Sequence, residues 1–275
     1  MFGTIGLLAN PERESAAALS DESRLYFETR GIRCVMLNGE EDEPEYKPEL
    51  ILTFGGDGTL LIGARYAMRY DIPLMGINLG TVGVLTEAEP EHLHDTLEAL
   101  ISRKYRTEER MLLSILNVKT GQQFNALNDV VITRGGYARL IRVECSVNGE
   151  QFGVFTSDGM IAATPTGSTG YSLSAGGPIV DPGMQCIALT PVCAHSLQQC
   201  PCIVSGNADI RFRLQPERKQ TAELQIDGIS RGTLESGDEI TVTGADKKIR
   251  LVRLYPYHFY SLLHNKLREW GSQHA

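Results

Sequence analysis

The stretch Gly55-Gly56-Asp57-Gly58-Thr59 stands between the apolar run Leu50–Phe54 and a second apolar run that begins at Leu60. A buried strand that ends in glycines and continues as a helix brings backbone N–H groups close to a phosphate, because glycine has no Cβ and accepts positive φ angles. Asp57 is the one charged residue of this turn. Its carboxylate repels phosphate, so its remaining roles are a magnesium contact or a base facing a hydroxyl. A plain tight turn, with Thr59 as a helix cap, explains the same residues equally well.

Strands and helices alternate on both sides of this turn. The predicted strands are the apolar runs 4–9, 33–37, 50–54 and 72–77. The first predicted helix runs from 12 to about 30, the second from the glycine turn to about 69, and the third from about 90 to 103. This alternation indicates a parallel sheet, whose ligands bind at the carboxyl ends of the strands. The glycine-rich stretch Asn78–Gly83 follows one such end. It is either the second wall of the same crevice or a plain connection.

From residue 104 the pattern changes to short β-rich runs, separated by turn signals such as Asn148-Gly149. Similar runs continue to about residue 254, and residues with helical spacing follow from 257 to 270. We therefore predict an α/β domain with a parallel sheet and glycine-rich loops (residues 1–103), a β-rich, sandwich-like domain (104–256) and a final helix.

The composition excludes several classes of protein. A chain of 275 residues with 42% hydrophobic content can bury a large core. The net charge of −8 disfavours nucleic acid and anionic membranes as partners. The six cysteines form no Cys-x-x-Cys pair, and no apolar run reaches the roughly 18 residues of a membrane span. We expect a cytoplasmic protein with reduced thiols, no export signal and no membrane segment.

The densest motif of the β-rich region runs from Asp158 to Pro178 and is full of glycines and hydroxyl residues. We interpret it as a loop whose hydroxyl and N–H groups face a polar ligand, with Tyr171 available to stack on a flat ring. A tightly wound structural loop is the alternative.

Taken together, these motifs closely resemble the NAD kinase family over nearly the whole chain. The matching segments are Gly55–Thr59, Asn128-Asp129, Asp158, Thr164-Pro165-Thr166-Gly167-Ser168-Thr169, Ala175–Pro178, Leu189–Pro191, His195-Ser196-Leu197 and Lys266-Leu267 with Trp270. The glycine turn alone is shared with lipid kinases, whereas the Thr-Pro-Thr-Gly-Ser-Thr segment is far more specific.

The resemblance implies an activity and its cofactors. Members transfer the terminal phosphoryl group of ATP, or in some cases of polyphosphate, to the 2′-hydroxyl of the adenosine ribose of NAD, with a divalent metal, Mg²⁺ by expectation. It also implies that the final helix, about 257–275, returns to the α/β domain, which binds the phosphate donor, and that the β-rich domain binds NAD. A homodimer or homotetramer with the β-rich domains in contact is expected.

The resemblance also assigns roles to single residues. Asp57 would be the catalytic acid/base facing the 2′-hydroxyl, with Gly58 beside the substrate. Asn128 and Asp129 would hold the ribose of the nicotinamide half, and Asp158 would contact the nicotinamide side. The remaining expected contacts are Arg139, from the same or a neighbouring subunit, Thr156, and the adenine or ribose contacts Thr169, Gly170, Tyr171, Ser172, Leu173 and Ser174. The phosphate-donor loop would comprise Gly55, Gly56, Thr59 and Asn78, and no residue is assigned to a metal.

Some positions depart from the family pattern. Many members carry Glu at Asp129, Ala at Gly170, Phe near Val84, Pro at Ala194 and Gln at Ile229. The loss of the Phe and the Gln affects fine contacts to NAD, and none of these departures removes Asp57. Two alternatives stay open: a lipid or other small-molecule kinase with the same glycine turn, and a non-catalytic NAD(P) sensor. The hydroxyl-rich segment 164–174 favours a nucleotide over a lipid.

Overall fold

The computed structural model describes residues 2–39, 43–80, 83–136, 139–195, 199–217 and 219–273, with side chains as far as Arg268. Residues 81–82 of the second glycine-rich stretch, Ser196 and Leu197, and the Trp270 side chain lie outside this description.

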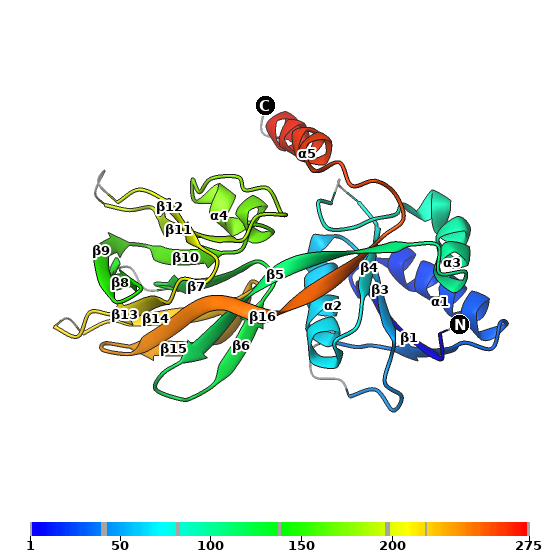
Figure 1. Ribbon diagram of the computed structural model, residues 1–275, viewed down its shortest axis with the longest axis horizontal. Coiled ribbons are helices and arrows are strands. Elements are labelled where there is room, and N and C mark those ends of the chain that lie inside the picture. Colours follow the sequence, from blue (N-terminus) through cyan, green and yellow to red (C-terminus); the bar gives the residue numbers. More distant parts are fainter. Residues whose placement is uncertain are drawn as a thin grey trace. The chain divides into compact units, whose positions relative to one another are not determined.

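The chain forms two compact units, one of Met1–Glu109 with Ile249–Ala275 and one of Arg110–Lys248 (Figure 1). The sequence placed these borders at 103/104 and 256/257. They differ because two long strands, β5 (Arg106–Asn117) and β16 (Glu239–Arg253), each begin in one unit and end in the other.

The first unit is a sheet with helices on both faces. Its strands are parallel and follow the order β2-β1-β3-β4-β16, and the end of β16 pairs with β4 at Leu251 and Leu74. The elements besides β16 are β1 (Thr4–Ala9), α1 (Glu14–Glu28), β2 (Arg33–Met36), β3 (Leu50–Gly55), α2 (Asp57–Tyr70), β4 (Leu74–Asn78), the 3₁₀ turn η1 (Pro90–His92), α3 (Leu93–Ile101) and α5 (Phe259–Gln273).

The burial of β3 explains how the helices cover this sheet. All six of its residues are buried, as is typical of a parallel strand covered on both faces. Leu50, Leu52 and Phe54 belong to a core shared with α1 and α3. Ile51 and Thr53 lie under Gly63 of α2. The period of two along the strand therefore places α1 and α3 on one face and α2 on the other, as Figure 1 shows.

The second unit is an antiparallel β-sandwich. One sheet has the order β12-β11-β10-β7-β14-β15, and the other contains β16-β13-β8-β9 with β5 and β6. The elements are β6 (Gln123–Ala126), β7 (Asp129–Thr133), β8 (Ile141–Val147), β9 (Glu150–Ser157), β10 (Gly159–Ala163), η2 (Gly167–Thr169), α4 (Tyr171–Ser174), β11 (Cys186–Val192), β12 (Cys202–Ser205), β13 (Ile210–Leu214), β14 (Thr221–Ile226) and β15 (Ile229–Glu235).

An apolar core joins the two sheets of the sandwich, with Ile132 and Met160 from one sheet and Val143 and Phe212 from the other. The predicted fold class, an α/β part with a β-rich part and a final helix, is confirmed. The predicted helix 90–103 is shorter and begins as η1, because Pro90 starts a single 3₁₀ turn before α3.

All six cysteines are free thiols. No helix in the described part of the chain combines the length and the hydropathy that crossing a bilayer requires.

Candidate active site

The glycine turn joins β3 to α2 as predicted, but its glycines do not have the positive φ angles that we expected. None of Gly55, Gly56 and Gly58 has a positive φ angle. A Cβ on Gly55 would collide with the Thr59 hydroxyl, whereas a Cβ on Gly56 or Gly58 would meet no atom within 4 Å. Space, not backbone strain, therefore requires glycine at position 55, and the backbone at 56 and 58 stays open. Thr59 is not the helix cap, because the N-cap position is Gly56.

A cavity of about 560 Å³ lies at the beginning of α2. Its walls come from the ends of β1 and β2 and from the first turn of α2: Leu8, Ala9, Asn10, Pro11, Glu12, Leu37, Asn38, Gly39, Gly58, Thr59 and Ile62. The first N–H groups of a helix have no acceptor within the helix and carry the positive end of its dipole. This cavity is therefore suited to a phosphate group.

The second glycine-rich stretch lies beside the first. Leu79 N–H donates to the Gly55 carbonyl at 3.0 Å, and Arg13 donates to the Leu79 carbonyl. Asn78 ends β4, and its side-chain amide donates to the Gly80 carbonyl at 3.5 Å. The described residues of this stretch therefore lie against the turn, but none of them lines the cavity, so both readings of the stretch stay open.

The Asp57 carboxylate is held by donors from two distant segments. The N–H groups of Val84 and Leu85 donate to Oδ2 and Oδ1, each at 3.1 Å. Lys266 Nζ, on α5, lies 3.0 Å from Oδ2. The side chain of Asp57 is 25% exposed. The carboxylate is thus fixed in orientation, yet open to solvent on one side.

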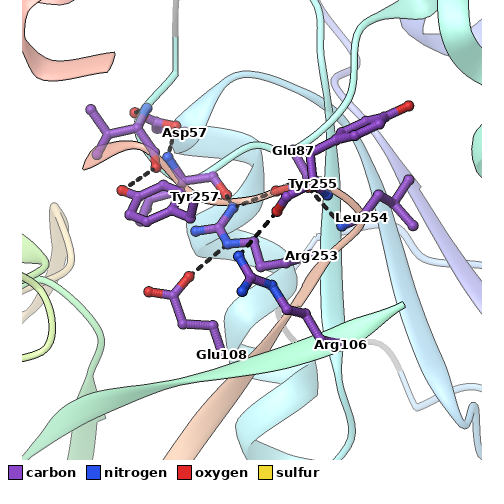
Figure 2. A network of polar contacts seen from close by, with 10 residues as sticks. Asp57, Glu87, Arg106, Glu108, Arg253, Leu254, Tyr255 and Tyr257 are labelled. Carbon is purple, nitrogen blue, oxygen red and sulfur yellow. Dashed lines mark hydrogen bonds and ion pairs between the residues drawn. The ribbon is translucent and has the colours of Figure 1, made fainter. Parts of the chain in front are cut away.

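A buried arginine holds the segment that supplies those two N–H groups. Arg253 donates to the Leu85 carbonyl at 3.1 Å, to Glu87 at 3.0 Å and to Glu108 at 2.7 Å. Figure 2 shows these contacts around Asp57. The Tyr257 hydroxyl donates to the Val84 carbonyl at 3.0 Å, and the Arg253 guanidinium lies 4.3 Å from the centre of its ring. The chain before α5 therefore clamps the turn at 84–87.

In the second unit, Asn128 and Asp129 stand at the beginning of β7, where Asp227 anchors their backbone. Its carboxylate accepts N–H bonds from Leu127 (2.9 Å), Asn128 (2.7 Å) and Asp129 (3.1 Å). Asp227 N–H donates in return to the Asp129 carbonyl at 3.0 Å, and Asp227 itself has a φ of +48°. Asp227 thus fixes the backbone that presents the Asn128 and Asp129 side chains.

Asp129 is 4% exposed. Burial, and to a lesser extent the negative charge of Asp227, raises the pKa of Asp129 from 3.8 to about 7. The Asp129 carboxyl is therefore readily protonated near neutral pH and can act as a hydrogen-bond donor as well as an acceptor.

This pKa predicts a pH dependence of stability. Because the folded state binds the Asp129 proton more tightly than the unfolded state, Asp129 costs the folded protein stability as pH rises from about 4 to about 7, with no further change above that. We expect the stability of Asp129→Asn relative to wild type to grow over this interval, measured by urea unfolding at several pH values. Asp246→Asn, an exposed site, is the control. A constant difference between the Asp129 variant and wild type would contradict the prediction.

The hydroxyl-rich segment packs directly on Asn128. Thr164 N–H donates to the Asn128 carbonyl at 2.8 Å, and the Thr164 hydroxyl donates to the Leu127 carbonyl at 2.6 Å. A Cβ on Gly170 would lie 3.6 Å from the Asn128 amide nitrogen. Two motifs that are far apart in the sequence are therefore brought together.

The expectation that the hydroxyls of this segment face a ligand is wrong for several of them. Ser168 accepts from Val180 N–H at 3.0 Å, Thr169 donates to the Thr166 carbonyl at 3.2 Å, and Ser172 bonds Thr190 at 2.9 Å. All three are buried. These hydroxyls hold the segment in a compact conformation through hydrogen bonds within the protein, as the alternative interpretation, a tightly wound structural loop, proposed. The residues they leave on the surface are Gly170, Leu173, Ser174 and Tyr171, of which Tyr171 is 43% exposed.

Asp158 lies close enough to Tyr171 to influence it. Burial raises the pKa of the Tyr171 hydroxyl, with smaller contributions from Cys193, Asp158 and Asp129. Asp158 itself accepts a bond from Arg134 Nε at 2.5 Å. Thr156 is partly buried near the end of β9, and Arg139 is exposed between β7 and β8. Among the described residues, no hydrogen bond or ion pair joins Arg139 to the other predicted site residues.

Sequence reasoning assigned no role to Asp227, Arg253, Arg134 or Glu87. Asp227-Gly228 carries a turn signal, and Arg253 interrupts an apolar run, so both had a visible cue. Arg134 and Glu87 had none. Lys266 entered only as part of a matching segment.

Comparison with known proteins adds the family. The model for the ATP-NAD kinase N-terminal domain matches residues 38–105, and the model for the ATP-NAD kinase C-terminal domain matches residues 127–254. The NAD kinase of Moorella thermoacetica is 38% identical over 282 residues, which cover 98% of this chain and 90% of that protein. This chain belongs to the NAD kinase family. The NAD kinase of Syntrophotalea carbinolica is 41% identical over 82% of this chain and 79% of its own length.

Solved NAD kinase structures have the same fold. The crystal structure of yeast NADH kinase complexed with NADH has a TM-score of 0.85 at 25% identity, covering 98% of this chain and 88% of that one. The structure of an NAD kinase from Archaeoglobus fulgidus in complex with ATP has a TM-score of 0.77 at 26% identity, covering 96% and 98%. The present protein is therefore an NAD kinase in both fold and family.

Proposed function

We propose that this NAD kinase transfers the terminal phosphoryl group of ATP to the 2′-hydroxyl of the adenosine ribose of NAD, with Asp57 as the base. The observation that carries the proposal is the Asp57 carboxylate, fixed by two backbone N–H groups beside a helix N-terminus that opens into a cavity. Solved structures of related proteins contain ATP in one case and NADH in the other, and NADH carries the same adenosine ribose as NAD, which supports the proposal.

The reaction follows from this geometry. The ribose oxygen attacks the terminal phosphorus of ATP, an O–P bond forms, and the bond from that phosphorus to the bridging oxygen breaks, so that ADP leaves with the electron pair. Asp57 accepts the hydroxyl proton. Because phosphoryl transfer has a loose transition state, positioning and charge neutralisation supply most of the catalysis. We assign the phosphates of ATP to the cavity at Gly58 and Thr59, and we keep Gly55, Gly56 and Asn78 as proposed parts of the phosphate-donor loop next to it.

NAD binding is assigned to the second unit. Asn128 and Asp129, anchored by Asp227, would bond the ribose hydroxyls, and Tyr171 with Gly170, Leu173 and Ser174 would contact a base or ribose. Thr169 and Ser172 act through their bonds within the segment. Asp158 remains a proposed contact of the nicotinamide side of NAD, and Thr156 and Arg139 remain proposed contacts of the substrate.

A divalent metal would enter with ATP as its magnesium complex. Among the described residues, no three His, Cys, Asp or Glu side chains gather as a metal-binding group. Mg²⁺ is commonly held by substrate phosphates together with one or two carboxylates and water. A site without a cluster of three protein ligands therefore fits a metal that the nucleotide carries. The metal would neutralise charge on the phosphates.

The proposal has three further parts. Polyphosphate is a further proposed phosphate donor, the protein forms a homodimer or homotetramer through its sandwich units, and it acts in the cytoplasm. Six free thiols agree with a reducing compartment. Sedimentation at micromolar concentration tests the assembly, and a pure monomer would contradict it.

The reaction itself is tested by incubating purified protein with Mg-ATP and NAD and measuring NADP with an NADP-specific dehydrogenase. We expect NADP to form in proportion to enzyme. Parallel samples replace ATP with polyphosphate and NAD with NADH, which defines donor and acceptor. Tight NAD binding without any phosphorylated product would instead identify a sensor, and product formed only from a lipid alcohol would identify the other kinase class.

A further inference from the structure

The C-terminal helix α5 places a lysine on the proposed base. Lys266 Nζ lies 3.0 Å from Asp57 Oδ2, and the two residues are 209 positions apart in the sequence. The side chains are 17% and 25% exposed, so the pair is largely sheltered from water. Such a contact is stronger than an exposed ion pair, because screening by solvent is reduced.

The placement of Lys266 is built into the packing of α5. Phe259, Leu263 and Lys266 are spaced by four and three residues and therefore share one face of the helix. Phe259 and Leu263 pack against Val84, with Tyr257 beside them. Val84 is also one of the two residues whose N–H groups hold Asp57. The face that carries Lys266 is thus fixed to the segment that orients the base.

The donors that the described residues supply to Asp57 leave one acceptor position of the carboxylate open. A carboxylate offers about four acceptor positions. Within the described residues, Oδ2 accepts from Val84 and Lys266, while Oδ1 accepts from Leu85 alone. A Cβ on Gly83 would lie 2.7 Å from Oδ1, so glycine at 83 keeps the approach to this oxygen clear. Oδ1 is the oxygen that can accept a substrate hydroxyl.

From these contacts we propose that Lys266 is a positioning residue for phosphoryl transfer. It holds Oδ2, directs Oδ1 to the ribose hydroxyl, and offsets the negative charge of Asp57 as the phosphates of ATP approach. The hydroxyl proton goes to Asp57, and Lys266 takes no part in the proton transfer. The inference rests on the role proposed above for Asp57 and makes α5 part of the catalytic machinery.

The test is a series at position 266. We expect Lys266→Met to lower kcat by about 10- to 100-fold, in the range of removing one preorganised donor, with KM for NAD and ATP changed less than about threefold. Lys266→Arg keeps the charge and should restore part of kcat, whereas Lys266→Gln keeps a donor without charge and should restore less. Arg268→Met removes an exposed cation from the same helix and should leave kcat unchanged.

The outcomes separate this inference from the function on which it rests. An inactive Asp57→Asn enzyme together with a normal kcat in Lys266→Met would overturn the inference alone. A rise in KM with unchanged kcat would also overturn it, because it would give Lys266 a binding role. An active Asp57→Asn enzyme would remove the proposed base and the inference together. If Lys266→Met does not fold, the kcat values of wild type, Lys266→Arg and Lys266→Gln decide the question, with the unfolding temperature of each measured alongside. A decrease in kcat in that order supports the inference, and equal values overturn it.

Discussion

Asp57→Asn is expected to lower kcat by about 10² to 10⁴, because an amide cannot take the proton of the ribose hydroxyl. The amide also offers only one acceptor oxygen, whereas Asp57 accepts bonds from Val84, Leu85 and Lys266. The variant should therefore lose turnover and a modest amount of stability, while binding of NAD largely persists. The measurements are NADP formation by the coupled assay and NAD binding by calorimetry.

Two controls make this result specific. Thermal unfolding of Asp57→Asn separates lost chemistry from lost structure. Asp71→Asn changes an exposed aspartate just after α2 and should retain full activity. A kcat of Asp57→Asn near that of wild type would remove Asp57 from the chemistry.

Arg253→Met is expected to cost about 3 to 5 kcal/mol of unfolding free energy, the range for breaking a buried ion pair by removing one partner. The Arg253 side chain is 1% exposed and that of Glu87 is 6% exposed. Methionine would leave Glu87 buried without its cation and the Leu85 carbonyl without this donor. Urea unfolding with a linear extrapolation measures the loss.

A matched control lies on the same strand. Arg250 bonds Asp71, and their side chains are 39% and 69% exposed, so Arg250→Met should cost less than about 1 kcal/mol. The double variant Arg253→Met with Glu87→Gln should recover part of the stability, because it removes the uncompensated charge. A loss from Arg253→Met no larger than that of the control would refute the clamp.

This variant should also lower kcat. Arg253 bonds the carbonyl of Leu85, whose N–H holds Asp57 Oδ1 (Figure 2). A looser turn at 84–87 would let the carboxylate rotate. We therefore expect turnover to fall below wild type under conditions where most of the protein is still folded.

The sequence alone predicted the elements around Gly55–Thr59 well, because the run from Leu50 and the following glycines depend on local backbone physics. It was wrong about positive φ angles at these glycines and about several of the hydroxyls of 164–174. A contact decides at both places: Thr59 occupies the space at Gly55, and Ser172 bonds Thr190 across the fold. Neither contact leaves a periodic signal along the chain.

The sequence by itself determined the fold class, the family and the identity of the proposed base, since these follow from short motifs and hydrophobic periodicity. Only the tertiary structure decided how that base is held. The donors to Asp57 come from 27, 28 and 209 residues away, and Asp227 reaches Asn128 across 99 residues. Such partners are chosen by the packing of whole elements, because a hydrogen bond at 3 Å depends on where the folded chain brings two atoms, not on their separation in sequence.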